Sequence, residues 1–357
     1  MTREAFEKDV SERLRQHLLH FPAARREDAV KFVFQAMLGV GHLLASREGT
    51  EEGIAREMGR VEAVREEPLY EILSPAWVRL NLRRALAEQI RPGTLAGMML
   101  AAGRTDFTRE DVAGLCLRVV PDGGESRKEA EFERIHDRNW LPSHSEAYRE
   151  AYNPAYRVIS SEWIPCMEAV LAIERKRGDD RRLLVTLDGP CASGKSTLAR
   201  RLASVFRGEV LHTDDFVISH ALKTPGRLAV PGGNCDAERL AGEAAAPFKE
   251  GRPVRYRRYD CMNDCLLPSE TLPETRVLIL EGSYCNLPAI RKYADIRLFL
   301  DAPREIRERR LAQRESAASL RQFHEKWIPL EDAYFSAYRL PDEGCVVIGQ
   351  GIWYNDQ

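Results

Sequence analysis

The hydrophobic pattern of the chain changes character about halfway along it. In the first half, apolar residues recur at the spacing of amphipathic helices. Such stripes run from Phe6 to Leu19, from Val30 to Gly41 and from Val78 to Ile90. No stretch of this half alternates convincingly as a strand would, and a capping-box pattern at Thr108 to Asp111 predicts one more helix start. We therefore expect residues 1–175 to form a mostly α-helical domain.

The second half alternates short apolar runs with stretches of helical periodicity. The apolar runs are rich in leucine and β-branched residues, as buried parallel strands are. Strands are expected over residues 183–188, 210–212, 277–280, 296–300 and 345–348. Helices are expected over residues 195–206, 236–248, 303–315 and 319–338. This alternation predicts an α/β domain over residues 176–357, with a parallel sheet flanked by helices and ligand chemistry at the carboxyl ends of the strands.

Length and charge agree with a two-domain protein of the cytoplasm. At 357 residues the chain is long for a single core, and the polar segment 175–182 is the expected junction. The net charge of -2 gives no electrostatic reason to expect a nucleic acid or an anionic membrane as partner. Residues 1–9 are too charged for a signal peptide, and the apolar stretch 29–45 is too short and interrupted to span a bilayer. We expect no membrane partner.

The 8 cysteines are scattered, which predicts reduced thiols. Only Cys261 and Cys265 lie close in the sequence, and no second pair or neighbouring histidine accompanies them, so a zinc site is not indicated. Cys191 lies inside the glycine-rich segment described next. We expect its thiol to be sensitive to oxidation or alkylation without being catalytic.

A complete phosphate-binding loop joins the strand 183–188 to the helix 195–206. Residues 189–196 read Gly-Pro-Cys-Ala-Ser-Gly-Lys-Ser and fit the pattern G-x-x-x-x-G-K-[ST]. Its glycines let the backbone turn so that N–H groups point at phosphate oxygens, Lys195 is expected to reach the β- and γ-phosphates, and the Ser196 hydroxyl to hold Mg²⁺. The expected nucleotide-binding residues are Gly189, Ala192, Ser193, Gly194, Lys195, Ser196 and Thr197. The motif predicts a P-loop NTPase-type fold that binds a nucleoside triphosphate.

Carboxylates follow the predicted strands near this loop. Asp214 and Asp215 come just past the strand 210–212, and Glu281 directly follows the strand 277–280. Phosphoryl transfer needs oxygen ligands for Mg²⁺ and a carboxylate that orients the acceptor hydroxyl. Asp214 is the candidate for the second role and Glu281 for the metal. A helix N-cap or a turn residue is the alternative for each of them.

An arginine-rich helix over residues 303–315 is a candidate lid. Arg307, Arg310 and Arg314 fall on one face by their spacing. Such a stripe suits a lid that clamps triphosphate oxygens and offsets developing charge. A solvated helix balanced by its own glutamates is the alternative interpretation.

The order of these motifs resembles the uridine kinase/phosphoribulokinase superfamily over roughly residues 180–350. The matching segments are the phosphate loop, Leu-His-Thr-Asp-Asp-Phe (211–216), Asn-Cys-Asp (234–236), Arg-Tyr-Asp (258–260), Leu-Glu-Gly-Ser-Tyr (280–284) and the arginine-rich helix after Phe-Leu-Asp (299–301). The resemblance implies Asp214 as the acceptor-positioning base, Glu281 in support of Mg²⁺, and Arg310 and Arg314 as catalytic lid arginines. The acceptor-binding residues that it implies are Asp215, Phe216, Asp236, Tyr259 and Asp260.

Departures from the family pattern leave the acceptor open. Val217 stands where uridine kinases usually have a tyrosine, the base-recognising histidine expected after Tyr259-Asp260 is absent, and residues 230–234 are unlike those enzymes. The resemblance therefore implies an ATP- and Mg²⁺-dependent kinase that phosphorylates a hydroxyl of a nucleoside-like or other small molecule. ATP itself is implied by the family, since the sequence shows no adenine-specific motif.

Two other functions remain open. Segment 143–157 interleaves tyrosines with arginines, a composition suited to stacking on bases and gripping phosphate, and equally to a well-packed connector. In the first alternative, Tyr148, Tyr152 and Tyr156 present an RNA or a modified nucleotide to the kinase domain, against which the neutral overall charge argues. In the second, the chain is a non-enzymatic, nucleotide-gated interaction module, for which carboxylates after strands have little use.

Overall fold

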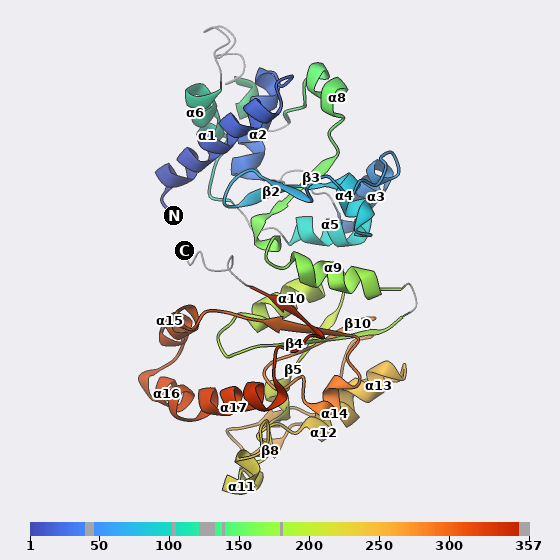
Figure 1. The fold of residues 1–357 in the computed structure, drawn as a ribbon, viewed down its shortest axis with the longest axis vertical. Coiled ribbons are helices and arrows are strands. Elements are labelled where there is room, and N and C mark those ends of the chain that lie inside the picture. Colours follow the sequence, from blue (N-terminus) through green and yellow to red (C-terminus); the bar gives the residue numbers. More distant parts are fainter. Residues whose placement is uncertain (40–45, 102–104, 121–132, 138–139, 179–180, 350–357) are drawn as a thin grey trace. The chain divides into compact units, whose positions relative to one another are not determined.

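The chain folds into two compact units in the computed structural model, which describes residues 1–39, 46–101, 105–120, 133–137, 140–178 and 181–349 (Figure 1). The units divide between Ile164 and Pro165. Helix α9 (Met167–Lys176), which precedes the junction expected near residue 175, packs against the sheet of the second unit. Each unit is described by itself below.

Helices make up most of the first unit. Helix α2 packs against α1, against α6 and against strand β2, and α3 packs against α5. The capping box at Thr108 is confirmed, because its side chain accepts from Asp111 N while Asp111 accepts from Thr108 N. The helices are α1 (Arg3–His20), α2 (Arg26–Leu38), α3 (Arg47–Met58), α4 (Leu82–Ala87), α5 (Pro92–Leu100), α6 (Arg109–Val119), α8 (Glu146–Tyr152) and the 3₁₀ turn η1 (Ser161–Trp163).

The expectation that the first half holds no strand is wrong. Strands β1 (Tyr70–Ile72), β2 (Trp77–Asn81) and β3 (Tyr156–Ser160) form an antiparallel sheet in the order β1-β2-β3. Strand β2 buries Trp77 to Leu80 on both faces, including the charged Arg79, so it lacks the polar alternation that identifies a half-buried strand. Its pairing partner β3 also lies far along the chain, beyond the reach of a local pattern.

The second unit is built on a five-stranded parallel sheet in the order β12-β11-β4-β10-β5. Figure 1 shows α9 and α10 on one face of this sheet and α13, α14 and α17 on the other. The predicted strands are confirmed to within a residue. They are β4 (Leu183–Asp188), β5 (Glu209–His212), β10 (Val277–Glu281), β11 (Ile296–Leu300) and β12 (Cys345–Ile348).

The helices predicted for the second half are also present, with short irregular turns between them. Helix α10 (Lys195–Phe206) has the predicted bounds, and the expected helix 236–248 is a run of α-, π- and α-helical turns. The others are η2 (Thr213–Phe216), η3 (His220–Leu222), α11 (Pro225–Leu228), α12 (Ala237–Leu240), α13 (Ala246–Lys249), α14 (Pro288–Arg291), α15 (Arg304–Arg314), α16 (Ala317–Gln322) and α17 (Ile328–Tyr338). Two hairpin-like pairs, β6 (Arg255–Tyr256) with β9 (Glu270–Thr271) and β7 (Tyr259–Asp260) with β8 (Cys265–Leu266), complete the unit.

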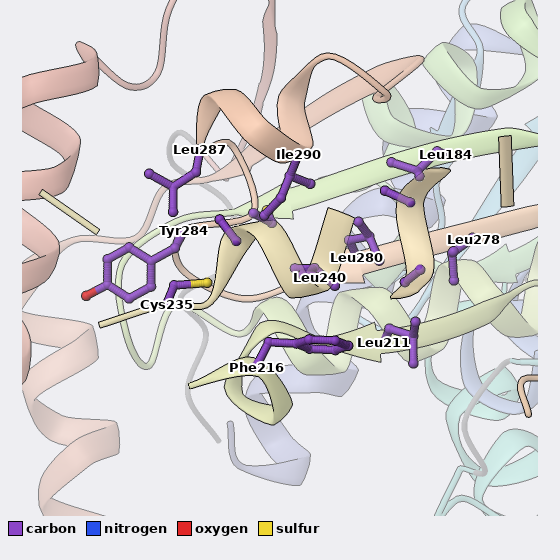
Figure 2. Close-up of a cluster of buried hydrophobic side chains, with 14 of the residues drawn as sticks. Leu184, Leu211, Phe216, Cys235, Leu240, Leu278, Leu280, Tyr284, Leu287 and Ile290 are labelled. Carbon is purple, nitrogen blue, oxygen red and sulfur yellow. The ribbon is translucent and has the colours of Figure 1, made fainter. Parts of the chain in front are cut away.

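A hydrophobic cluster fixes the strands that carry the site (Figure 2). It joins Leu184 of β4, Leu211 of β5 and Leu280 of β10 to side chains from the covering helices, such as Leu240 and Ile290. Every residue of β4 and of β10 is buried, as expected for central parallel strands covered on both faces. Within the described residues, no helix is long and apolar enough to cross a membrane.

The start of β4 is held by a buried carboxylate that the hydrophobic pattern does not reveal. Asp295 accepts hydrogen bonds from Leu184 N at 2.8 Å, from Lys249 Nζ at 2.6 Å and from Arg181 Nη2 at 2.8 Å. Burial alone would raise the pKa of Asp295, but these hydrogen bonds and the charge of Lys249 lower it below the ordinary value of 3.8. The ionised carboxyl group therefore stabilises the strand that leads into the phosphate loop.

We predict that Asp295→Ala lowers the free energy of unfolding of the second unit by roughly 2 kcal/mol, because it leaves a buried amide and an ammonium without their acceptor. Since the folded-state pKa is depressed, this contribution is present above pH 3.8 and is lost as the pH falls through the lower folded value. Urea denaturation followed by circular dichroism at neutral and at acidic pH measures both effects.

Glu274→Ala is the matched control, because the Glu274 side chain is 91% exposed and its one ion pair among the described residues is with Arg182 at 3.6 Å. Its loss is expected to change stability by less than about 0.5 kcal/mol. Equal effects of the two substitutions would contradict the role assigned to Asp295.

Candidate functional site

The carboxyl ends of β4, β10 and β5 meet at one edge of the second unit's sheet. The parallel register places Glu281 beside Leu187 on one side and beside His212 on the other. The phosphate loop follows β4, and the turn η2 with Asp214 follows β5. Residues that are about 70 to 90 positions apart in the sequence therefore share one edge, as the strand pattern predicted.

The phosphate loop has the backbone that its glycines permit. Gly189 and Gly194 have φ values of 142° and 104°, and Ala192 between them has φ of 58°. A Cβ atom on Gly189 would lie 2.3 Å from the carbonyl oxygen of Leu300 on β11, so no other residue fits there without moving the strand. The loop is thus locked against the sheet at its first residue.

The loop presents free amide groups at the start of α10. Among the described residues, the N–H groups of Ala192, Gly194, Lys195 and Ser196 donate to no acceptor in the protein. Amides at a helix N-terminus attract anions through their own partial charge and the helix dipole. The side chain of Lys195 is buried and its Nζ donates to Gly189 O at 2.7 Å and Pro190 O at 2.9 Å, within the loop.

Glu281 and Ser196 form the oxygen-rich part of the site. Ser196 Oγ donates to Glu281 Oε1 at 3.1 Å, and the other carboxylate oxygen lies 2.6 Å from His212 Nδ1. Hydrogen bonding to Glu281 raises the pKa of His212, which burial opposes. Sequence reasoning missed His212 as a partner, although it ends the strand next to Glu281.

This donor set suits Mg²⁺. In the described residues no three His, Cys, Asp or Glu side chains gather as a metal-binding group. Mg²⁺ does not need such a cage, because it usually takes one or two protein carboxylates or hydroxyls and completes its shell with water and substrate phosphates. The hydroxyl of Ser196 and the carboxylate of Glu281 are hard oxygen donors beside the phosphate loop, so they fit this ion.

Asp214 lies close to the same group of charges. Asp214 is an exposed residue, but protein atoms surround its carboxyl group, and this desolvation raises the pKa of the carboxyl group. Glu281 and Glu331 raise it further by their negative charges, whereas Lys195 and His212 lower it. The structure therefore brings Asp214, Lys195 and Glu281 together, as the sequence predicted.

The residues near η2 that were expected to bind the acceptor differ in burial and in hydrogen bonding. Asp215 is partly buried and desolvation raises its pKa. Phe216 is fully buried, so its ring is part of the core, with the Arg239 guanidinium 4.4 Å from the ring centroid. Asp236 caps α12 and accepts from Arg239 N and Arg239 Nε, both at 3.2 Å. Phe216 and Asp236 thus have clear structural tasks.

Tyr259 and Asp260 lie in strand β7, beside η2. Tyr259 OH donates to Asp264, and Asp260 accepts from Met262 N at 2.8 Å and from Asn263 Nδ2 at 2.7 Å. Both side chains therefore form hydrogen bonds within the β7–β8 hairpin.

Asn234, in the segment that was expected to contact the acceptor, is buried, and its Oδ1 atom has no hydrogen-bond partner in the described part of the chain.

Of the three predicted lid arginines, Arg310 hydrogen-bonds to the phosphate loop, whereas Arg307 and Arg314 bond to other residues. Arg310 Nη1 donates to Ala192 O at 3.2 Å and to Ser193 O at 3.0 Å, so it holds the backbone of the phosphate loop. Arg314 is exposed and its Nε donates to Glu315 Oε1 at 2.7 Å, while its guanidinium lies over the ring of Phe323. Arg307 Nε donates to Ala302 O at the start of α15.

A buried network anchors the loop and was only partly visible in the sequence. Asp188 accepts from Gly189 N at 2.8 Å, from Tyr334 OH at 2.7 Å and from Asn286 Nδ2 at 3.2 Å. Burial raises the pKa of Asp188 to about 6, and these donors oppose the rise. Tyr334 lies on α17, far along the chain, and only its spacing from Glu331 on one helix face could have indicated it.

Glu331 holds the loop at a second point. Its Oε2 accepts from Cys191 N at 2.8 Å, and its Oε1 accepts from Ser283 Oγ at 2.5 Å. Cys191 itself is buried, and burial together with Glu331 raises the pKa of its thiol to about 12. The expectation that this thiol is sensitive to oxidation or alkylation is therefore not supported, since reactivity requires the thiolate.

The aromatic segment of the first unit is internal. Tyr148 is buried against His144, and Tyr152 OH accepts from Ala23 N at 2.9 Å. Tyr156 packs against Arg79 and hydrogen-bonds to His144. The three tyrosines therefore pack within the unit, as the packed-connector interpretation expected, and do not form an exposed stacking face.

No family model matches the chain, but two curated proteins and several solved structures are similar to it. A chloroplastic phosphoribulokinase from Mesembryanthemum crystallinum is 26% identical over 211 residues, which is 50% of this chain and 51% of that protein. A phosphoribulokinase from Synechocystis sp. (strain ATCC 27184 / PCC 6803 / Kazusa) is 28% identical over 146 residues, 39% of this chain and 43% of that protein. The chain thus spans about half the length of the curated relatives it matches.

Among solved structures, a possible uridine kinase from Bacillus stearothermophilus is 20% identical with a TM-score of 0.40, over 51% of this chain and 97% of that chain. A putative fructose transport system kinase from Silicibacter sp. TM1040 is 24% identical with a TM-score of 0.40, over 48% and 93%. The phosphate loop and the parallel sheet lie in one half of the chain, and phosphoribulokinases match about half of the chain. About half of the chain is thus similar in sequence to phosphoribulokinases, and this part carries a phosphate loop on a parallel sheet.

Proposed function

We propose that the chain is an ATP- and Mg²⁺-dependent kinase that transfers the γ-phosphoryl group to a hydroxyl of a small molecule. The observation that carries this proposal is the grouping of Asp214, Lys195 and Glu281 beside the free amides of the phosphate loop. A protein that only binds nucleotide has no use for a carboxylate placed to orient an acceptor.

Each residue has a role in this proposal. The loop amides and Lys195 hold the triphosphate, for which Lys195 exchanges its bonds to the loop carbonyls for bonds to phosphate. Ser196 and Glu281 would hold Mg²⁺, which neutralises phosphate charge when it is bound. Asp214 orients the acceptor hydroxyl and takes its proton as the new O–P bond forms and the bond from the γ-phosphorus to ADP breaks. Its raised pKa makes it a better proton acceptor than an ordinary aspartate.

The acceptor is a small polar molecule, and its class is open to direct measurement. The relatives are named phosphoribulokinases, so a pentose phosphate is one candidate, and the resemblance to uridine kinases makes a nucleoside another. The buried side-chain Oδ1 of Asn234 has no hydrogen-bond partner among the described residues, so it is a free acceptor for a substrate hydroxyl beside Tyr284.

We predict that Asp214→Asn binds ATP with a dissociation constant within about threefold of the wild type but transfers phosphate roughly 100-fold or more slowly. The amide keeps the size of the carboxyl group but cannot take the proton. ATP binding is measured by isothermal titration and transfer by acceptor-dependent release of ADP. Undiminished transfer in this variant would remove Asp214 from the mechanism, whereas Lys195→Ala serves as the contrast that is expected to lose ATP binding.

We also predict that at least one of three acceptor pools stimulates ADP release from Mg·ATP: nucleosides, pentose phosphates, or a small-molecule cell extract. Mass spectrometry should then detect a product heavier by one phosphate, and the Asp214→Asn protein should not form it. If ATP binds but no pool stimulates release, the small-molecule kinase proposal fails. In that case the nucleotide-gated module becomes the better account.

Phosphoryl transfer also requires the phosphate loop to keep its position, and helix α17 supports the loop through Asp188. Tyr334 donates to Asp188, which in turn accepts from the first amide of the loop. Removing the Tyr334 hydroxyl leaves a buried carboxylate with one donor fewer and leaves the charge of the site unchanged.

We predict that Tyr334→Phe lowers the free energy of unfolding of the second unit by roughly 1–2 kcal/mol and weakens ATP binding. Tyr338→Phe is the matched control, since Tyr338 lies on the same helix and its hydroxyl has no partner among the described residues. Urea denaturation and ATP titration of both variants test this. Equal behaviour of the two variants would show that the Asp188 bond does not support the loop.

A further inference from the structure

The direction of the Asp214 carboxyl group is set by the turn that carries it. Among the described residues, this carboxyl group forms no hydrogen bond or ion pair. Its orientation therefore depends on the backbone of η2, the 3₁₀ turn that follows β5. A group that orients a reacting hydroxyl has to be held to within about 0.5 Å of its productive position. The contacts that hold η2 in place are therefore needed for phosphoryl transfer.

The start of η2 is held against the end of β10. Thr213 Oγ1 donates to Ser283 O at 2.9 Å. A Cβ atom on Gly282 would overlap with Thr213 Oγ1, and Gly282 has a φ of 131°, so only glycine fits beside the turn. These contacts fix the residue before Asp214 and leave the residues after it to be held by other elements.

The end of η2 is held by the guanidinium group of Arg239. This residue lies on α12, and its Nη2 donates at 3.1 Å to the carbonyl oxygen of Asp215, the residue after Asp214. The guanidinium group also lies over the ring of Phe216, 4.4 Å from the ring centroid. Phe216 is fully buried in the hydrophobic cluster of Figure 2. The two residues that follow Asp214 therefore contact the same side chain.

The other two nitrogens of Arg239 bind the segments that were expected to contact the acceptor. Nε donates to Asp236 Oδ2 at 3.2 Å. Nη1 donates at 2.5 Å to the carbonyl oxygen of Arg257, which lies between β6 and β7. Strand β7 contains Tyr259 and Asp260. One guanidinium group thus joins η2 to the start of α12 and to the chain that leads into the β7–β8 hairpin.

Arg239 is enclosed, and its charge is balanced. Its side chain is 10% exposed, with Asp236 Oδ2 at 3.2 Å from Nε and Glu243 Oε2 at 3.6 Å from Nη1. Glu243 also accepts from Arg257 N at 2.9 Å, which adds a second bond to the same segment. The planar group therefore uses each of its three nitrogens for a different segment. A lysine would keep the charge, but its single nitrogen does not reproduce this fork.

We propose that Arg239 is a positioning residue for phosphoryl transfer, which aligns the Asp214 carboxyl group with the hairpin where the acceptor is expected to bind. This inference rests on the kinase proposal above and adds a residue that neither the motif spacing nor the family resemblance indicates. The hydrogen bonds of Arg239 go to η2, to α12 and to the β6–β7 segment. None of these segments contains an expected nucleotide-binding residue, so ATP binding should not depend on Arg239.

The first test separates phosphoryl transfer from nucleotide binding. Arg239→Lys is expected to lower the acceptor-dependent kcat by about 10- to 100-fold, since a small misplacement of a reacting group has effects of this size, and to leave the dissociation constant of ATP within about threefold. Arg252→Lys is the control, because Arg252 is 59% exposed and pairs with Glu250. If Arg239→Lys transfers phosphate as fast as the wild type, this inference is wrong. If the wild type transfers to no acceptor pool, the kinase proposal fails and this inference fails with it.

Chemical rescue separates positioning from a general effect on folding. In Arg239→Ala, methylguanidinium chloride is expected to raise the transfer rate by about fivefold or more, whereas methylammonium chloride at the same concentration is not, because only the planar cation can donate to two carbonyl groups in the fork geometry. Circular dichroism establishes that the variant is folded. Equal effects of the two cations, or no effect of either on the folded variant, would contradict a positioning role.

Hydrogen exchange followed by mass spectrometry tests the same contacts without an acceptor. In Arg239→Lys, the amides of residues 213–218 and 257–260 are both expected to exchange about fivefold or more faster, whereas those of residues 183–206 should exchange as in the wild type. Unchanged exchange in the first two segments would show that Arg239 does not hold them. Faster exchange throughout the second unit would also overturn the inference, because it would show a general loss of stability.

Discussion

The buried carboxyl group of Asp188 joins three parts of the second unit that are far apart in the sequence. It ends β4, accepts the first amide of the phosphate loop, and receives hydrogen bonds from Asn286 after β10 and from Tyr334 on α17. A carboxylate without these donors would be too costly to bury. The position of the loop, the end of β10 and the packing of α17 therefore depend on one another through a single charged group.

Several contacts hold the phosphate loop in one position, although Ala192 within it has a left-handed backbone conformation. Gly189 touches the backbone of β11, Arg310 holds the carbonyls of Ala192 and Ser193, and Glu331 accepts the amide of Cys191. These contacts occupy the carbonyls of Ala192 and Ser193 and the amide of Cys191, while the amides of Gly189 and Ser193 donate to Asp188 and to Pro190 O. The remaining amides, up to Ser196 at the start of α10, have no acceptor among the described residues, so an anion there meets both their partial charges and the helix dipole. Support and binding thus use different atoms of the same few residues.

Local pattern was enough to predict the parallel strands, the loop and the grouping of Asp214 with Glu281. Central parallel strands are uniformly apolar, and their carboxyl ends must lie on one edge, so residues that follow them meet. The same reasoning failed for the first unit, where β2 buries Arg79 between aromatic rings and pairs with a strand far along the chain. A buried charge breaks the hydrophobic pattern on which a strand prediction depends. Its neutralisation by Glu71 is visible only when β1 and β2 are paired.

Several side chains have partners that no spacing rule indicates. Asp236 caps α12, Phe216 is buried in the core, and the thiol of Cys191 is enclosed beside Glu331. The sequence by itself determined the P-loop, the order of the parallel strands along the chain, and the carboxylates at their ends, because each of these is a local pattern with a local cause. Only the tertiary structure decided which charges are paired, as Arg79 and Glu71 are. Burial and hydrogen bonding depend on neighbours that the chain brings together from distant positions.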